Sequence, residues 1–441
     1  MPTKTAPMKA EYPRILTAPP GPKAKAVIAK DKEFSSPSYI KEYPLAMAGG
    51  KGAMVEDVDG NRYIDWMAGI AVSATGYQHP LVTKAVQEAA GKFLHICGTD
   101  FYYQGFSDLC EALALSAPGG GKWRTFLSNS GTEAIEGAVK LVRHHTKRAA
   151  LVSFHSSFHG RSYAAMTLTT SKVKYRKGFG PLLPETYHLP FHNPYRNTLE
   201  ECVSAAKDLF ETKLDPSDVA AVIMEPLQGE GGYVMPSKEF LQFWRKFCTD
   251  HGILLVFDEV QCGAGRTGKM WASEHYGVVP DVFVTAKGLG SGMPIGAIVA
   301  KESVMTWPRG SHGSTYGGNP VACAAALATI GLIKDGLAAN AAKMGERLLA
   351  GFKKLAAKHS CIGDVRGLGL FIGVEFVKDR KTKEPAGELM AALEQLAFTK
   401  GLLLLGCGKS TIRVAPPLVL TAYDVDKGLE IFDECLAELT R

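Results

Sequence analysis

Residues 252–268 read GILLVFDEVQCGAGRTG, a short and continuous apolar run that ends at Asp258. Similar apolar runs recur along the chain, and helical patterns separate some of them. The runs are 149–154, 219–224, 253–257 and 282–285, and the helical stretches include 132–145 and 238–251. Continuous apolar strands between helices are typical of a parallel sheet covered on both faces. The sequence therefore predicts an α/β fold built on a mainly parallel sheet.

Composition narrows the class of protein further. The chain has 441 residues, of which 46% are hydrophobic and 21% are charged, as in a globular protein with a large core. This excludes a disordered, collagen-like or coiled-coil chain. The net charge of +6 is spread without a basic patch, so we expect no nucleic-acid partner. Nine scattered cysteines never form Cys-x-x-Cys, which indicates neither a disulfide framework nor a zinc site, and favours a reducing, cytoplasmic compartment.

The chain also divides into segments of different pattern. Residues 1–65 hold a proline-rich stretch over 1–30, expected to be an extended arm without an apolar signal segment, and a hairpin around Asp59-Gly60-Asn61. We expect this segment to pack with a small domain. Residues 66–325 form the expected large domain, and 326–441 the small α+β domain. The latter begins within a long helical region, 320–358, and contains apolar runs at 370–376, 402–405 and 411–414. The most apolar stretch, 321–333, is too short for a membrane span, so no membrane partner is expected.

Three motifs contain residues of the types that bind ligands or act in catalysis. Ser128 to Glu133 (SNSGTE) precede an amphipathic helix pattern, which suits either an anion such as phosphate or a plain helix cap. Asp258 ends a buried strand, where a metal, a ribose hydroxyl, a protonated ring nitrogen or a structural salt bridge could each pair with it. Lys287 follows another strand and precedes three glycines at alternate positions, which favours an unusual buried loop over a surface lysine.

Taken together, these motifs supply what pyridoxal 5′-phosphate requires: an amine for a Schiff base, an acid for the pyridinium nitrogen, and a helix N-terminus for the phosphate. Competing motifs fail. Gly406-Cys-Gly-Lys-Ser410 has Leu403 where a Walker A loop needs glycine, and no complete Gly-x-Gly-x-x-Gly follows a strand. No histidine cluster has metal-ligand spacing, so no metal is expected.

Six stretches resemble the class III aminotransferases, a family of fold-type I pyridoxal-phosphate enzymes. They are SNSGTEAIEGAVK (128–140), SFHGRSYAAMTLT (157–169), IMEPLQGEGG (223–232), LLVFDEVQCGAGRTG (254–268), TAKGLGSGMPIGA (285–297) and HGSTYGGNPVACAAAL (312–327). Their order and spacing match the family from about Tyr39 to the C-terminus. The resemblance implies a large domain with a mainly parallel sheet, a smaller α+β domain, and pyridoxal 5′-phosphate as cofactor.

The resemblance also implies roles for individual residues. Lys287 matches the Schiff-base lysine and Asp258 the partner of the ring nitrogen, which makes these two the catalytic residues. Other matches bind the cofactor: Ser130, Gly131 and Thr132 at the phosphate, Phe158 and Val260 on the two ring faces, Gln261 at the ring hydroxyl, and His159 and Glu225 beside it. Thr315 matches a threonine that reaches the phosphate of the neighbouring subunit, so a homodimer, or a dimer of dimers, is implied.

Substrate class follows from four further matches. Arg413 resembles the arginine that binds the α-carboxylate of 2-oxoglutarate, and Glu230 the glutamate that pairs with it when the amino donor lacks that group. Arg161 resembles the arginine that 4-aminobutyrate aminotransferases use for the distal carboxylate, and Ile70 lines the same pocket. These matches imply a PLP-dependent ω-aminotransferase that moves an amino group from a 4-aminobutyrate-like donor to 2-oxoglutarate, giving a semialdehyde and glutamate.

Other readings remain open. The FDEVQCG and SHGSTYGGNP stretches are equally similar to acetylornithine aminotransferases, and the segments YPRI (12–15) and HNPYRN (192–197) resemble a branch that includes amino-acid racemases. Racemases of that branch lack counterparts of Arg161 and Glu230, which favours transamination. The rival from a different class is a non-catalytic binding module on an α/β scaffold.

Overall fold

The computed structural model describes residues 12–441, and a seven-stranded sheet lies at its centre. The strand order is β4-β10-β9-β8-β7-β5-β6; the strands from β9 to β6 in this order run parallel, and β10 is antiparallel to both of its neighbours. The bounds are Trp123–Ser128 (β4), Ala150–Phe154 (β5), Thr186–Leu189 (β6), Val219–Met224 (β7), Leu254–Asp258 (β8), Val282–Thr285 (β9) and Gly296–Lys301 (β10). The expected mainly parallel sheet is therefore confirmed, and the four predicted strands match to within one residue.

Helices cover both faces of this sheet. They are α3 (Pro80–Ala90), α4 (Gln104–Ser116), α5 (Gly131–Thr146), α6 (Tyr163–Leu168), α7 (Leu199–Thr212), α8 (Lys238–His251) and α9 (Pro320–Leu332). Successive residues of a strand point to opposite faces. Accordingly, Leu255 and Phe257 pack in one core with Trp244 of α8. Val256, between them, packs in a second core with Ile135 of α5. Two buried faces explain why β8 has no polar residue before its last position.

Two smaller sheets lie beside the C-terminal helices. One is antiparallel, in the order β11-β12-β15-β14, with bounds Ile362–Leu368, Phe371–Phe376, Thr411–Val414 and Leu405–Cys407. The other joins β1 (Met47–Lys51), β2 (Met54–Asp57), β3 (Arg62–Asp65) and β13 (Leu402–Leu403). The pairing of β2 with β3 confirms the predicted hairpin. Because β13 runs parallel to β3, a segment near the C-terminus completes the N-terminal sheet.

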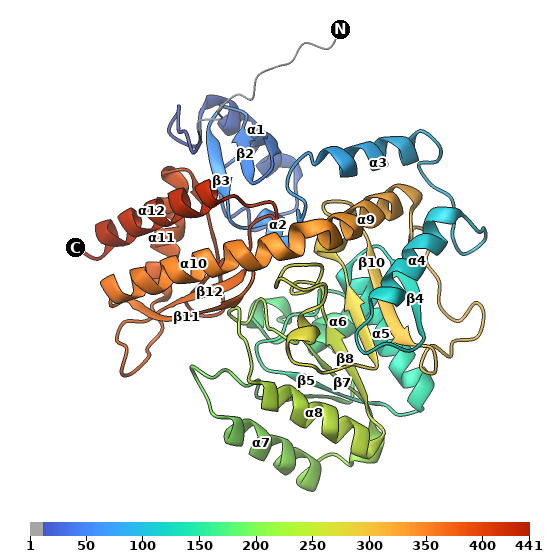
Figure 1. Cartoon of the computed structure of the whole chain (residues 1–441). Helices are drawn as coiled ribbons and strands as arrows, with labels where there is room; N and C mark the ends of the chain where they lie inside the picture. The colour runs from blue at the N-terminus through green and yellow to red at the C-terminus, as the bar shows by residue number, and fades with distance from the viewer. Residues whose placement is uncertain (1–11) are drawn as a thin grey trace.

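A long helical run connects the large sheet to these small sheets. Figure 1 shows α9 and α10 (Ala338–Lys358) in orange as one rod that extends toward α11 (Gly387–Thr399) and α12 (Ala422–Leu439). A wide turn at Ile333–Leu337 interrupts the rod, with Gly336 at φ +139°. The predicted helical region, 320–358, is thus confirmed. In the described part of the chain, the run Pro320–Lys358 is the one helix long and apolar enough to cross a membrane. The expectation that no segment passes this test is wrong. Small residues make α9 apolar, and they pack it closely against α3 and α4.

The prediction of an extended arm over residues 1–30 is also wrong in part, because Pro22–Phe34 forms helix α1. Proline is tolerated at the first helical position, where the helix has no use for its N–H. The carboxylate of Asp59, in the hairpin turn, accepts the next two N–H groups: Lys23 N lies 2.9 Å from Oδ1 and Ala24 N lies 2.9 Å from Oδ2. The cap therefore comes from a distant residue, which the local pattern did not reveal. The N-terminal ten residues, expected to lack a signal segment, lie outside the described residues.

A buried arginine ties the large sheet to the small antiparallel one. Arg266, in the loop after β8, is almost completely buried, and its Nη1 donates to the carbonyl oxygens of Leu370 and Pro416. In return, Leu370 N donates to the Arg266 carbonyl at 2.9 Å. These bonds fix β12 and β15 relative to β8. The division of the chain at residues 65 and 325 stays a prediction, which limited proteolysis can test.

Candidate active site

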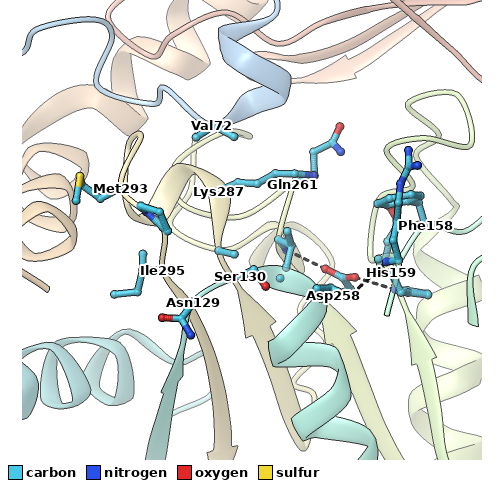
Figure 2. Close-up of a pocket in the computed structure, with 18 of the residues that line it drawn as sticks. Val72, Asn129, Ser130, Phe158, His159, Asp258, Gln261, Lys287, Met293 and Ile295 are labelled. Carbon is cyan, nitrogen blue, oxygen red and sulfur yellow. Dashed lines mark hydrogen bonds and ion pairs between the residues drawn. The ribbon is translucent and has the colours of Figure 1, made fainter. Parts of the chain in front are cut away.

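A cavity of about 400 Å³ opens where β8 and β9 end and α5 begins. Open α/β sheets bind ligands at this edge, outside the carboxyl ends of their strands. Eleven of the residues singled out from the sequence line the cavity: Ser130, Gly131, Thr132, Phe158, His159, Arg161, Glu225, Asp258, Val260, Gln261 and Lys287. Figure 2 shows several of them around one space, with Lys287 reaching across above Asp258. The fold thus brings together residues that are up to 157 positions apart in the sequence (130 to 287).

The start of α5 lies at the floor of the cavity and has the features of an anion site. Ser130 is the cap residue, and its Oγ accepts the Glu133 N–H at 3.3 Å. Within the described residues, no protein group accepts the N–H of Gly131 or Thr132. Free N–H groups and the helix dipole favour an anion here. A side chain at Gly131 would collide with Val260, since an added Cβ would lie 2.9 Å from Cγ1.

Asp258, the last residue of β8, is held from two sides. His159 Nδ1 donates to Oδ2 at 2.7 Å, and Val260 N donates to Oδ1 at 3.0 Å. Burial lowers the pKa of His159, but the hydrogen bond and charge of Asp258 outweigh burial and raise it above its ordinary value. His159 Nε2 is buried without a partner in the described structure. The imidazole therefore fixes the carboxylate in one orientation within the cavity.

Lys287 follows β9 and begins the short turn Lys287–Leu289. Its φ of +41° is unusual for a residue with a side chain, and such strain persists only where the surroundings enforce it. Burial lowers the pKa of the Lys287 amine, although the charges of Glu230 and Asp258 oppose that shift. A lowered pKa increases the neutral fraction of the amine, which is the form that acts as a nucleophile or a base.

Two further polar groups complete the wall. Glu225, after β7, accepts N–H groups from Phe158 at 3.1 Å and Gly229 at 2.9 Å. Burial nevertheless raises the pKa of Glu225 to about 7. Gln261 Oε1 is buried and has no partner in the described structure. Buried polar atoms are normally hydrogen-bonded, so an orphaned one in a cavity wall points to a polar ligand.

Glu230 and Arg413 form a buried ion pair close to this cavity. Arg413, on β15, donates through Nη1 to Glu230 Oε1 and through Nη2 to Oε2 at 3.3 Å and to the Gly406 carbonyl at 3.1 Å. Burial raises the pKa of Glu230, but Arg413 outweighs burial and holds it below its ordinary value. The preceding residue, Gly229, packs against Gln261 of the cavity wall.

The backbone around Glu230 is fixed on both sides. The loop closes through paired hydrogen bonds between Gln228 and Val234, at 3.1 and 2.9 Å. Gly408 N donates to the Glu230 carbonyl at 2.9 Å. Arg366 donates through Nε to the Tyr233 carbonyl oxygen at 2.8 Å and through Nη2 to the Gly232 carbonyl oxygen.

Arg161 lies at the exposed rim of the cavity. Its guanidinium carbon is 4.3 Å from the centroid of the Tyr175 ring, and in the described part of the chain it forms no ion pair or side-chain hydrogen bond. Tyr175 was not singled out from the sequence, because nothing in its local pattern distinguishes it. Val72, Met293 and Pro294 also line the cavity and carried no signal in the sequence.

Four of the expected site residues do not line this cavity: Glu230 and Arg413, which lie close to it, and Thr315 and Ile70. Thr315 is exposed on the loop before α9. Ile70 is 41% exposed, in a short left-handed stretch where its φ is +67°. Neither lines the cavity, so any role of these side chains there needs a second subunit or a change of conformation.

The cavity fits pyridoxal 5′-phosphate. Free N–H groups at the start of α5 suit its phosphate, and the fixed Asp258 carboxylate suits a protonated ring nitrogen. The orphaned oxygen of Gln261 suits the ring hydroxyl, and the Lys287 amine suits the aldehyde. The chemistry of the donor set therefore matches each polar group of this cofactor.

Residues 36–436 match the family model described as Aminotransferase class-III, so the chain belongs to the class III aminotransferases. The protein is therefore an enzyme, a pyridoxal-phosphate-dependent transaminase, and a non-catalytic binding module is excluded. A relative named 5-aminovalerate aminotransferase from Pseudomonas aeruginosa is 38% identical over 95% of this chain and 99% of its own length. One named 4-aminobutyrate aminotransferase from Mycobacterium tuberculosis is 38% identical over 97% and 98%.

Relatives with other names are similar at nearly the same level. An acetylornithine aminotransferase from Caldanaerobacter subterraneus is 37% identical over 94% of this chain and 100% of its own. An alanine/serine racemase from Pyrococcus horikoshii is 36% identical over 97% and 93%. Among solved structures, a transaminase from the marine bacterium Virgibacillus has a TM-score of 0.89 at 29% identity, covering 94% of this chain and 99% of its own. A PLP-bound amine transaminase from an uncultivated Pseudomonas species has a TM-score of 0.84 at 28% identity, covering 92% and 97%.

Proposed function

We propose that this enzyme transfers the amino group of an ω-amino acid, such as 4-aminobutyrate or 5-aminovalerate, to 2-oxoglutarate. One observation carries the proposal. Of two arginines near the cavity, Arg413 already has a carboxylate partner in Glu230, whereas Arg161 has none in the described residues. A donor whose only carboxylate is distal to the amine would leave the first pair intact and bind the second arginine. The names of the relatives support this substrate class.

The same two arginines account for a second substrate of different charge. An oxo acid such as 2-oxoglutarate carries an α-carboxylate and a distal one. Its α-carboxylate would replace Glu230 as the partner of Arg413, and its distal carboxylate would bind Arg161. A buried guanidinium left without an anion is strongly penalised, so Glu230 serves as the anion while the ω-amino acid is bound.

The cofactor-binding roles belong to this proposal as well. Ser130, Gly131 and Thr132 would bind the phosphate, Phe158 and Val260 would enclose the ring, and Gln261 would bind the ring hydroxyl. Glu225 and His159 would support the cavity wall and the Asp258 carboxylate. When bound, pyridoxal phosphate supplies an aldehyde that takes up the donor amine and a ring that withdraws electrons from the carbon to be deprotonated.

Lys287 and Asp258 would be the catalytic residues. Lys287 would hold the cofactor through its amine before the donor binds. Its amine, with a lowered pKa, then takes the proton from the amino-bearing carbon of the donor and delivers it to C4′ of the cofactor. Asp258 keeps a proton on the ring nitrogen through its carboxylate, which His159 holds in place.

The proposal also covers the oligomeric state of the enzyme and its cellular compartment. Thr315 is exposed in one chain, which suits a threonine that binds the phosphate of a second copy, and we propose a homodimer or a dimer of dimers. All nine cysteines are free, and six of them are buried, which suits the reducing cytoplasm.

Half-reactions followed by cofactor absorbance test the substrate class. The panel comprises 4-aminobutyrate, 5-aminovalerate, N-acetylornithine, L-alanine and n-butylamine, each mixed with the purified enzyme in single turnover. We expect the two ω-amino acids to convert the cofactor fastest. Fastest conversion by N-acetylornithine would instead support the acetylornithine reading. Racemisation of L-alanine without net amino transfer would support the racemase reading.

A further inference from the structure

Tyr175 holds two residues of the cavity at once. Its ring lies 4.3 Å from the guanidinium carbon of Arg161 and packs edge-on against Phe158, with centroids 5.6 Å apart and planes at 77°. It ends the short turn Val173–Tyr175, and its ring is buried. Burial raises the pKa of the Tyr175 phenol, so the ring stays neutral at physiological pH.

The way in which Arg161 is held matters for its function. A guanidinium binds a carboxylate through N–H groups that lie in its own plane. An acidic partner would occupy those groups and would compete with the substrate. An aromatic face instead attracts the cation from above and leaves the in-plane donors free. The guanidinium is thereby held in one place before the substrate arrives, and less side-chain entropy is lost on binding.

We propose that Tyr175 is a positioning residue that sets the preference for donors with a distal carboxylate, by holding the Arg161 guanidinium over its ring. The proposal rests on the proposed function, in which Arg161 binds that carboxylate. Phe158, which lines the cavity, contacts the Tyr175 ring in an edge-type arrangement and so connects the ring that holds the guanidinium to the cavity wall.

The experiment compares two donors that differ only in the carboxylate, 4-aminobutyrate and n-propylamine, in the holoenzyme. The measured quantity is the ratio of the two kcat/KM values in the donor half-reaction. Tyr175→Leu should raise KM for 4-aminobutyrate about three- to tenfold, in line with the strength of one cation–π contact. The rate with n-propylamine and the absorbance spectrum of the bound cofactor should stay unchanged. Tyr175→Phe keeps the ring and should restore the preference to within about twofold of the original enzyme.

A double-mutant cycle separates positioning from a general structural effect. If Tyr175 acts through Arg161, Tyr175→Leu should change the donor ratio little in an Arg161→Ala background, because coupled residues are not additive. An equal effect in both backgrounds would overturn the inference. If Tyr175→Leu does not fold, Tyr175→Met can replace it in the same measurements, because methionine also removes the ring but introduces an unbranched apolar side chain of greater length.

The two proposals fail in distinguishable ways. Loss of the donor preference in Arg161→Ala but not in Tyr175→Leu would refute the role of Tyr175 and leave the proposed function standing. An unchanged preference in Arg161→Ala would refute the proposed binding of the distal carboxylate itself.

Discussion

The carboxylate of Asp258 and the imidazole of His159 form a buried pair, with Nδ1 2.7 Å from Oδ2. The dashed line in Figure 2 marks this contact at the edge of the cavity. Because a carboxylate can only accept, the ring must carry its proton on Nδ1. The pair thus presents an oriented carboxylate to the cavity, and the first prediction concerns that carboxylate.

Asp258→Asn should weaken cofactor binding and slow the donor half-reaction by about a thousandfold, or ~4 kcal/mol at ~1.4 kcal/mol per tenfold. A neutral amide cannot hold a proton on the ring nitrogen. Single-turnover absorbance and cofactor titration measure the two effects. Asp218→Asn, in an exposed turn, is the control. Activity within tenfold of the original enzyme would refute the role of Asp258.

Lys287→Ala should leave the protein folded and able to bind pyridoxal phosphate, yet abolish turnover. This lysine is proposed both to bind the cofactor and to move the proton. Borohydride should label the original enzyme at Lys287, whereas it should not label the variant. Lys84→Ala, at an exposed lysine of α3, should behave like the original enzyme. Substantial remaining transamination would mean that another base moves the proton.

Arg161→Ala and Arg413→Ala should differ in the half-reactions that they damage, because both substrates carry a distal carboxylate but only 2-oxoglutarate carries an α-carboxylate. A charge-assisted hydrogen bond contributes about 1.5–3 kcal/mol, so Arg161→Ala should raise KM for 4-aminobutyrate about 10- to 150-fold. Arg413→Ala should chiefly impair the half-reaction with 2-oxoglutarate, and it leaves Glu230 without its partner. Lysine should substitute poorly at either position, because it offers no planar fork. Equal damage to both half-reactions from Arg413→Ala, or an unchanged 4-aminobutyrate half-reaction in Arg161→Ala, would contradict the assignment.

Glu394→Gln should change how stability depends on pH. Burial, reinforced by Glu42, raises the pKa of Glu394 from 4.5 to about 7, although it accepts the Gly406 N–H at 2.8 Å. The folded state then binds a proton that the unfolded chain releases, so this group's contribution to stability falls as pH rises from about 4.5 to 7. Between pH 4.5 and about 7, the midpoint of thermal unfolding should therefore fall less in Glu394→Gln than in the original enzyme. Glu111→Gln, at an exposed carboxylate, should keep the original slope; an identical slope in Glu394→Gln would refute the prediction.

Asp59→Ala should loosen the start of α1, because it removes the acceptor of the Lys23 and Ala24 N–H groups. The loss of a helix cap costs about 1 kcal/mol, so hydrogen exchange of these amides should accelerate about fivefold. Exchange in the central strands should not change. Asp59→Asn keeps one acceptor oxygen and should show a smaller effect. Unchanged exchange in Asp59→Ala would show that the Pro22–Phe34 helix does not depend on this cap.

Much of the fold and of the cavity could be predicted, for a physical reason. Asp258 and Lys287 each follow a buried apolar strand, and the carboxyl ends of parallel strands meet at one edge of a sheet. Residue type and strand position together therefore place these side chains near each other. Their catalytic roles stay predictions.

The features that were missed depend on contacts between distant segments. The cap of α1 comes from Asp59, more than thirty positions away, so the prolines before Pro22 suggested an extended arm. Tyr175 contacts Arg161 across a loop and a helix, and its own neighbours in the sequence give no sign of that role.

The fixed loop around Glu230 has a consequence for the speed of turnover. Because the loop is held through Gly408 and Arg366, the proposed exchange of partners at Arg413 would require only rotation of the Glu230 side chain. Closure of a domain takes about microseconds to milliseconds, whereas rotation of a side chain moves no backbone. On the proposed function, the enzyme would alternate between its two substrates without a slow conformational step, and added viscogen should not slow the exchange beyond its effect on substrate diffusion.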